Sequence, residues 1–254
     1  MNILFTICGR EGSKGVKNKN IKILKDFPLI YYTIAAIELM KEKRKDLQID
    51  FCINSDGKEI LNVCKQFADY VLIDRPKELA TDISPKIPVI IYSLKYMEER
   101  NNKEYDYVID LDITSPLRTV GDIEGIIEKS INSDKDVVFS VVPARRNPYF
   151  NMVERKKNEV IKCKEGDFVR RQDAPEVFDM NASIYCYKRK KLIECPKKSP
   201  LEYNFEIFEM RETGIIDIDS EKDFVLLELL SDYYFKDEYK DIYSYLLDIK
   251  NEKH

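Results

Sequence analysis

The sequence predicts an α/β protein with a Rossmann-like, wound, mostly parallel sheet and a small lobe protruding from it. Short apolar runs typical of buried strands alternate with segments of helical spacing along most of the chain. The links between these segments are short, which favours right-handed connections between parallel strands. A basic loop punctuated by glycines follows the first strand, at the edge where such sheets bind anions.

The alternation begins with an apolar strand at 3–8 and a helix at 28–37, in which Ile30, Ile34 and Ile37 lie on one face. Further strands are predicted at 49–54, 70–73, 107–113, 136–142 and 180–187, and further helices at 59–67, 87–97, 120–131 and from about 220 to 230. The alternation around 217–219 predicts one more short strand.

Two segments depart from this pattern. Residues 147–180 are charged and hairpin-like, with a turn at 156–158, so we expect them to protrude as a lobe from a main domain spanning 1–233. Residues 234–254 are rich in tyrosine and charge and predict a C-terminal helical tail outside the catalytic core. A chain of 254 residues is long enough for one α/β domain with such a lobe.

Composition narrows the function. The formal net charge of −4 provides no global basic field for nucleic acid. No apolar run is long enough to span a bilayer, so we expect a cytoplasmic protein that does not bind membranes. The six cysteines are scattered without a Cys-x-x-Cys pair, which is typical of free buried thiols. The single histidine is His254, so catalysis is expected to depend on carboxylates, cations, amides and Mg²⁺.

The loop at 9–20 is the strongest candidate for a ligand site. Its three glycines permit positive φ and close backbone approach, and its cations are Arg10, Lys14, Lys17 and Lys19. The loop lacks both the Walker A ending and the dinucleotide Gly-x-Gly-x-x-Gly pattern. From spacing alone, a phosphate-binding loop and a merely solvated polar loop both remain open.

The order of residues in this loop is more specific. It reads Arg10-x-Gly12-Ser13-Lys14-Gly15 and then Lys19-Asn20, which resembles the nucleotide-binding loop of the acylneuraminate cytidylyltransferases, the CMP-sialic acid synthetases. Four later segments resemble the same family in the expected order. They are Arg75-Pro76-x-Glu78-Leu79-Ala80-x-Asp82, Thr114-Ser115-Pro116-Leu117-Arg118, Arg171-Gln172 with Asn181 to Tyr185, and Asp217-Ile218-Asp219-x-Glu221-x-Asp223.

The resemblance implies a nucleotidyltransferase fold and transfer of a cytidylyl group from CTP to an acidic nine-carbon sugar, giving a CMP-sugar and pyrophosphate. The catalytic residues implied are Arg10, Lys14, Lys19, Asp217 and Asp219. The nucleotide would be bound by Arg10, Gly12, Ser13, Lys14, Lys19, Asn20, Arg75 and Lys86. The sugar would be bound by Asp112, Thr114, Ser115, Arg118, Arg171, Gln172, Asn181 and Tyr185.

Mg²⁺ is the implied cofactor, with Asp217, Asp219 and Asp112 as ligands, because carboxylates are its preferred protein ligands. The alternative for the Asp217–Asp219 segment is that Asp219 or Ser220 caps the following helix, and the alternative for Asp112 is that it caps the next turn. Lys86 stands at the start of a helix, where a cation is unfavourable, so it either faces solvent or holds a phosphate.

The family's lobe packs on a second subunit, so the resemblance also implies a homodimer. Departures from the family pattern at Glu11, Lys86, Asp112, Phe150 and Asp179 favour a legionaminic-type nonulosonic acid over N-acetylneuraminate. Two alternatives stay open, which are guanylyl or cytidylyl transfer to a different sugar and a non-catalytic nucleotide-binding module.

Overall fold

A computed structural model describes residues 1–12, 15–65, 70–81, 84–213 and 217–252. Its centre is a seven-stranded sheet in the order β11-β7-β10-β6-β1-β4-β5. The strands are β1 (Asn2–Gly9), β4 (Gln48–Ser55), β5 (Val71–Asp74), β6 (Tyr107–Leu111), β7 (Val137–Pro143), β10 (Phe178–Lys188) and β11 (Phe205–Glu209). All neighbours pair in parallel except β10, which is antiparallel to both β6 and β7. The predicted wound, mostly parallel sheet is therefore confirmed.

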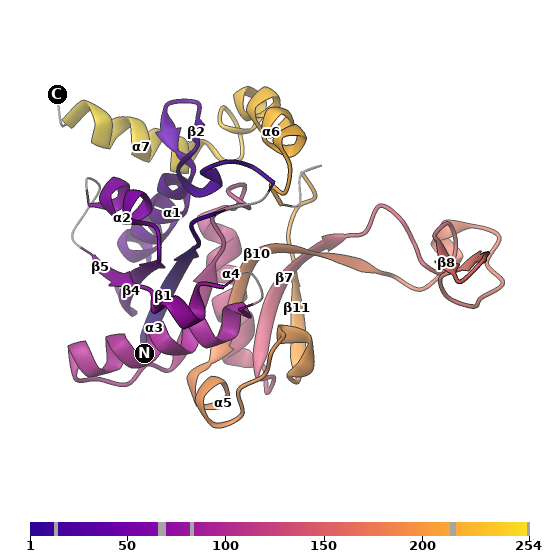
Figure 1. The fold of residues 1–254 in the computed structure, drawn as a ribbon, viewed down its shortest axis with the longest axis horizontal. Helices are drawn as coiled ribbons and strands as arrows, with labels where there is room; N and C mark the ends of the chain where they lie inside the picture. Colours follow the sequence, from indigo (N-terminus) through magenta and orange to yellow (C-terminus); the bar gives the residue numbers. More distant parts are fainter. Residues whose placement is uncertain (13–14, 66–69, 82–83, 214–216, 253–254) are drawn as a thin grey trace.

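Helices cover both faces of this sheet (Figure 1). They are α1 (Leu29–Lys43), α2 (Lys58–Cys64), α3 (Lys86–Asn101), α4 (Val120–Asn132), α5 (Arg189–Glu194), α6 (Glu221–Tyr234) and α7 (Lys240–Glu252). Alternate residues of β1 divide between two apolar cores, since Ile3, Phe5 and Ile7 pack with α1 and α4 whereas Leu4 packs with α3. The first strand is consequently buried on both faces.

The C-terminal tail is part of the main body. Helix α7 packs against α1, and Ile242 and Leu246 are buried in the same core as β1. Tyr32 stacks on Phe235, which stacks on Tyr243, with ring centroids 5.1 Å apart in both pairs. Residues 240–252 thus form a helix that packs on the same core as the central sheet.

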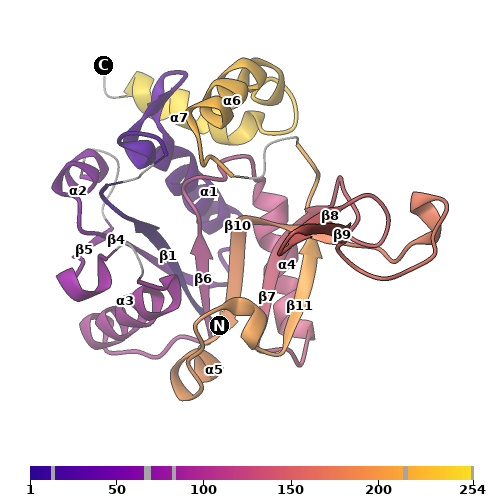
Figure 2. The same cartoon turned by 45° about the vertical axis from the view of Figure 1, so that its right-hand side comes forward.

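The segment between β7 and β10 extends away from the body and ends in the two-stranded hairpin of β8 (Val153–Lys156) and β9 (Glu159–Lys162), as Figures 1 and 2 show. A second small hairpin, β2 (Ile23–Leu24) with β3 (Phe27–Pro28), precedes α1. In the described part of the chain, no helix is both long and apolar enough to cross a bilayer.

Two local predictions differ from the structure. Strand β11 was not expected, because its residues follow a segment without a clear pattern, yet it pairs in parallel with β7 at the edge of the sheet. The strand predicted around 217–219 is wrong for the described residues, which are irregular. Ser220 instead caps α6 in a reciprocal capping box with Asp223. The backbone before α6 therefore adopts the conformation that the N-terminal cap of this helix needs.

Candidate active site

A cavity of about 400 Å³ lies at the carboxyl ends of β1 and β6, and we call it the central cavity. Its lining combines cations and carboxylates from distant parts of the chain. The lining residues are Cys8, Arg10, Lys19, Asn20, Arg75, Leu79, Thr81, Ser84, Lys86, Val89, Asp112, Thr114 and Asp217. Eight of these had been predicted as site residues from the sequence.

The first loop closes this cavity by contacting the segment that precedes α6. Lys19 Nζ donates a hydrogen bond to the carbonyl of Ile218 and lies 3.6 Å from Asp219 Oδ1. Gly15 lies so close to this segment that a Cβ added to it would be 1.9 Å from the carbonyl oxygen of Asp219. Asn20 Nδ2 donates to the carbonyl of Arg10 at 3.0 Å and holds the loop in shape. Ser13 and Lys14 lie outside the described residues.

Arg75 fixes the strand ends beneath the loop. It is buried, and it donates to Asn54 Oδ1 at 2.8 Å, to the carbonyl of Asn54 at 2.9 Å and to the carbonyl of Gly9 at 3.0 Å. Asn54 was not predicted as a site residue, although an amide at the carboxyl end of a buried strand was a signal for it. Arg75 thus ties β1 to β4 while its remaining surface lines the cavity.

Three charged groups meet at the floor of the central cavity. Lys86 Nζ lies 2.6 Å from Asp110 Oδ2 and 2.7 Å from Asp112 Oδ2. Burial opposes the charge on Lys86, but Asp110 and Asp112 raise its pKa well above the usual value. Asp110 is fully buried and was not predicted, although an aspartate inside an otherwise apolar strand is itself a signal. Lys86 therefore lies beside two carboxylates and lines the central cavity.

Within the described ranges Asp217 makes no ion pair, and burial raises its pKa. A hydrogen bond from Thr114 and the charge of Lys19 lower the pKa, while the charge of Asp112 raises it further. Among the described residues, no hydrogen bond reaches its buried Oδ1 atom. Asp219 is exposed over 82% of its side chain and approaches Lys19. An unpaired, partly buried carboxylate beside a second one is a suitable ligand pair for a cation.

Asp112 does not join that pair. Its Oδ1 accepts hydrogen bonds from the backbone and hydroxyl of Thr114, and its Oδ2 is bound to Lys86. No group of three histidine, cysteine or acidic side chains placed to hold a metal occurs in the parts of the chain that the structure describes. Of the three carboxylates predicted as metal ligands, Asp112 and Asp217 line the central cavity and Asp219 lies beside Lys19, while Asp112 is paired with Lys86.

Several residues predicted to contact the sugar are buried and do not line the central cavity. Arg118 is fully buried and donates to the carbonyls of Asp112 and Ser115 and, at 3.1 Å, to Ser183 Oγ. Burial lowers its pKa to about 10, so it stays protonated at neutral pH. Ser115 Oγ donates to the carbonyl of Asn181 at 2.8 Å. This placement favours support of the 112–118 turn over direct contact with a ligand.

Strand β10 forms the far side of this support. Ser140 Oγ donates to Asn181 Oδ1 at 2.6 Å, next to a register shift between Met180 and Tyr185. Ala182 within the shift has a φ of 50°, in the left-handed region. Burial raises the pKa of Tyr185 to about 12, and its ring centroid lies 5.9 Å from Lys86 Nζ. Tyr185 thus packs beside the charged floor and is not part of the cavity lining.

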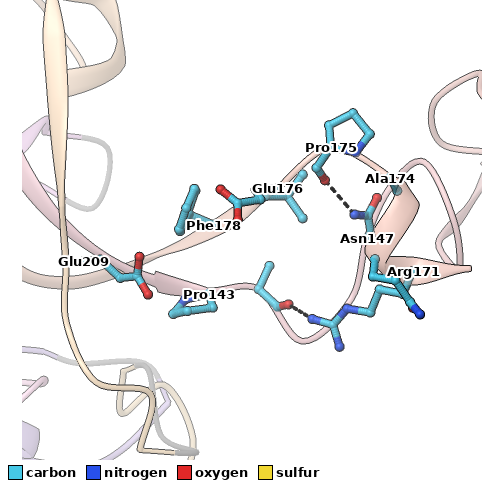
Figure 3. A pocket seen from close by; sticks show the side chains of 11 residues that line it. Pro143, Asn147, Arg171, Ala174, Pro175, Glu176, Phe178 and Glu209 are labelled. Carbon is cyan, nitrogen blue, oxygen red and sulfur yellow. Dashed lines mark hydrogen bonds between the residues drawn. The ribbon is translucent and has the colours of Figure 1, made fainter.

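A second cavity, which we call the stem cavity, lies where the lobe leaves the body and measures about 490 Å³ (Figure 3). Arg171 and Gln172 line it, and Arg171 donates to the carbonyl of Ala144. Asn147 Nδ2 donates to the carbonyl of Pro175 at 2.9 Å across the same turn. The two cavities share no lining residue, so within the described part of one chain Arg171 and Gln172 do not meet the other predicted site residues.

Comparison with known proteins agrees with this geometry. A family model described as cytidylyltransferase matches residues 4–245. A CMP-N,N'-diacetyllegionaminic acid synthase of Campylobacter jejuni is 42% identical over 228 residues, and a post-translational flagellin modification protein B of Campylobacter coli is 40% identical over 228 residues. Each alignment covers 90% of this chain and 94% of the relative. The resemblance drawn from the sequence is therefore confirmed at the level of the family.

Solved structures support the fold alone. A CMP:2-keto-3-deoxy-manno-octonic acid synthetase complexed with CTP matches with a TM-score of 0.65 and 15% identity. The match covers 92% of this chain and 99% of the solved one. The expected nucleotidyltransferase fold is confirmed by this likeness.

Proposed function

This chain belongs to the cytidylyltransferase family, and from that premise we propose that it transfers a cytidylyl group from CTP to an acidic nine-carbon sugar, giving a CMP-sugar and pyrophosphate. The observation that carries the proposal is the contact of Lys19, which lines the central cavity, with Ile218 and Asp219. A cationic loop beside a carboxylate pair, with Asp217 of the pair lining the cavity, is what a metal-bound triphosphate requires.

The first loop would bind the triphosphate. Arg10 and Lys19 line the cavity, and Arg10 also donates to the carbonyl of Thr81 at 3.1 Å, which joins the loop to the segment before α3. Asn20 and Arg75 lie deeper, at the strand ends, where they would contact the base and ribose. The anomeric hydroxyl of the sugar would attack the α-phosphorus in line, and these residues would position the reactants and neutralise charge.

The donor set fits one Mg²⁺ ion at Asp217 and Asp219. The fit rests on the unbonded, buried Oδ1 of Asp217 and on the burial that raises the pKa of this carboxyl, since a bound cation relieves both. When bound there, Mg²⁺ would withdraw charge from the phosphate oxygens. Asp112 is excluded from the ligand set by its ion pair with Lys86.

We propose N,N'-diacetyllegionaminic acid as the acceptor, because it appears in the name of the relative that is 42% identical over most of both chains. The departures at Lys86 and Asp112 agree with an acceptor other than N-acetylneuraminate, since they replace a hydroxyl residue and an amide with an ion pair. This pair lies in the cavity lining, where it can bear on substrate choice.

We further propose a homodimer in which the lobe of one chain completes the site of the other. Arg171 and Gln172 lie on the lobe stem, away from the central cavity of their own chain. Helix α6 presents an apolar face that includes Leu229, exposed by 70%, and the hairpin presents Val153, exposed by 68%. Residues 221–234 include four acidic residues and one basic residue, whereas 153–162 include four basic and two acidic residues, so the two surfaces are complementary.

Two experiments test this arrangement. Leu229→Asp should convert the dimer to a monomer in analytical ultracentrifugation, whereas Val225→Thr at the edge of the same face should not. Mixing Arg171→Ala with Asp217→Asn protein should restore up to about a quarter of wild-type activity, because half of the dimers are then mixed and each has one complete site. Failure of the mixture to regain activity would show that Arg171 does not act across the dimer.

The activity itself is tested by pyrophosphate release with CTP, Mg²⁺ and a panel of nonulosonic acids. We expect turnover with CTP and none with GTP, and the largest kcat/KM with N,N'-diacetyllegionaminic acid. Asp217→Asn should bind CTP weakly and turn over at least about 100-fold more slowly while remaining folded by circular dichroism. Preference for GTP would indicate the sister transferase, and CTP binding without turnover of any sugar would indicate a binding module.

A further inference from the structure

The ion pair at the floor of the central cavity is not among the groups assigned above to the triphosphate or the metal. Lys86 comes from the first turn of α3 and meets Asp112 at the carboxyl end of β6, with 2.7 Å between Nζ and Oδ2. Both side chains reach the cavity surface, since Lys86 is 34% and Asp112 24% exposed. A partly exposed ion pair contributes little to stability, so stability alone does not explain the pair.

Both charged groups are held rigidly from behind. Asp110, fully buried, lies 2.6 Å from Lys86 Nζ and accepts a hydrogen bond from Thr6 Oγ1 at 2.7 Å. Asp112 accepts hydrogen bonds from Thr114 on its other oxygen. The ammonium and the carboxylate therefore face the cavity in a fixed relation, as a preorganised binding group requires.

The charges of this group determine what it can bind. Lys86 and the buried Arg118 behind it balance Asp110 and Asp112, so the group is neutral as a whole. A neutral group does not compete with Arg10 and Lys19 for phosphates or for the carboxylate of a sugar. Lys86 donates a hydrogen bond to Asp112 and forms an ion pair with the buried Asp110, and no other hydrogen bond from Lys86 exists among the described residues. A free donor beside a carboxylate acceptor matches adjacent hydroxyls, which both accept and donate.

We propose that Lys86 and Asp112 together bind neighbouring hydroxyl groups of a sugar ring in the central cavity and thereby determine which sugar is accepted. The inference rests on the proposed function. The ring is either the ribose of CTP or the acceptor sugar, both of which carry hydroxyls and both of which must reach this cavity. Lys86 is thus a specificity residue for hydroxyls and is not a phosphate ligand.

Asp112→Asn is the first variant, because it keeps the shape of the side chain and leaves Lys86 paired with Asp110. Calorimetric titration with CTP and 2'-deoxy-CTP gives the ratio of their Kd values. If the ribose is the ligand, the wild type should bind CTP at least about tenfold more tightly than 2'-deoxy-CTP, and the variant should lose this preference. If the acceptor is the ligand, the ratio stays constant and the KM of N,N'-diacetyllegionaminic acid rises about tenfold.

Two controls separate this role from a structural one. Lys86→Met with Asp110→Asn removes the ammonium together with its buried partner and should reproduce the effect of Asp112→Asn. Glu98→Gln weakens the ion pair of α3 with Arg189, at 3.0 Å, outside the cavity lining and should change neither quantity. If both cavity variants keep the ratio and the acceptor KM of the wild type, the proposal is overturned. Wild-type protein that binds CTP but turns over no sugar would refute the proposed function, while the Kd ratio would still test this inference.

Discussion

The contact between the first loop and the segment before α6 can be tested at Gly15. A Cβ at this position would lie 1.9 Å from the carbonyl oxygen of Asp219 and 3.0 Å from its carbonyl carbon. Carbon and oxygen atoms in close contact are about 3.3 Å apart, so Gly15→Ala must separate the two segments by more than about 1 Å. The obstacle is backbone, which cannot turn aside as a flexible side chain can.

The separation acts directly on the residues assigned to the triphosphate. Lys19 is bonded to Ile218 and lies 3.6 Å from Asp219, so it cannot keep both contacts if the loop moves away. A displacement of about 1 Å commonly lowers the rate of an enzyme about 100-fold. Crowding of this kind costs about 1–3 kcal/mol of stability, which is less than the stability of most domains, so the variant should stay folded.

Steady-state pyrophosphate release at varied CTP, with a thermal melt of the same sample, measures both effects. We expect kcat/KM to fall about 100-fold in Gly15→Ala. Gly121→Ala is the matched control, because its added Cβ meets only Thr119 Oγ1 at 3.4 Å in the first turn of α4. Activity of Gly15→Ala within twofold of the wild type would refute the packing of the first loop on Asp219.

Three further predictions concern charge and backbone. Asp217→Asn should raise the Tm of the metal-free protein by about 2–4 °C, since burial raises the pKa of this carboxyl and disfavours its ionised form. The gain in Tm should shrink at acidic pH, where the wild-type carboxyl is protonated, and an unchanged Tm at neutral pH would contradict the reasoning. Tyr243→Phe removes a 2.7 Å bond to Asp26 and should cost about 1 kcal/mol at pH 7. Because that bond lowers the pKa of Asp26, the stability lost in Tyr243→Phe should decrease as pH falls through this pKa. Urea titrations at pH 7 and pH 3 measure the loss, and equal losses at the two pH values would disprove the reasoning. Ala182→Gly should raise the free energy of unfolding by about 1 kcal/mol, because alanine at φ 50° is strained, and a loss of stability would contradict the assigned backbone.

The fold was predictable wherever hydrophobic periodicity was strong. Strand β1 has apolar residues on both faces, and helix α1 has them at helical spacing. Both elements were located correctly from the sequence. Strand β11 was missed because Phe205 and Ile207 alternate with Glu206 over only five residues at the sheet edge, and the segment before it carries no periodic signal. A strand of this kind is stabilised by its pairing with β7, which the sequence does not reveal.

The candidate site was predictable in its residues more than in its contacts. The family resemblance implied that Arg10, Lys19 and Asp217 belong to one site, and the structure brings all three together in the central cavity. The partner of Lys86 was not predictable, because its contacts with Asp110 and Asp112 depend on how α3 packs across β6. A lysine at the start of a helix and an aspartate inside a strand predict an ion pair only when the two elements are known to be adjacent.

Binding of CTP should itself tighten the molecule, because the central cavity is closed by groups 200 residues apart in the sequence. Without ligand, the described contacts that join the first loop to 217–219 are those of Lys19 and Gly15, while Asp217 keeps an unbonded oxygen. A ligand that binds only the closed arrangement at 100 times its Kd adds about 2.7 kcal/mol to the free energy of unfolding. The buried charge of Asp217 destabilises the empty site, and the same charge makes the stability of the protein depend on the nucleotide and its metal.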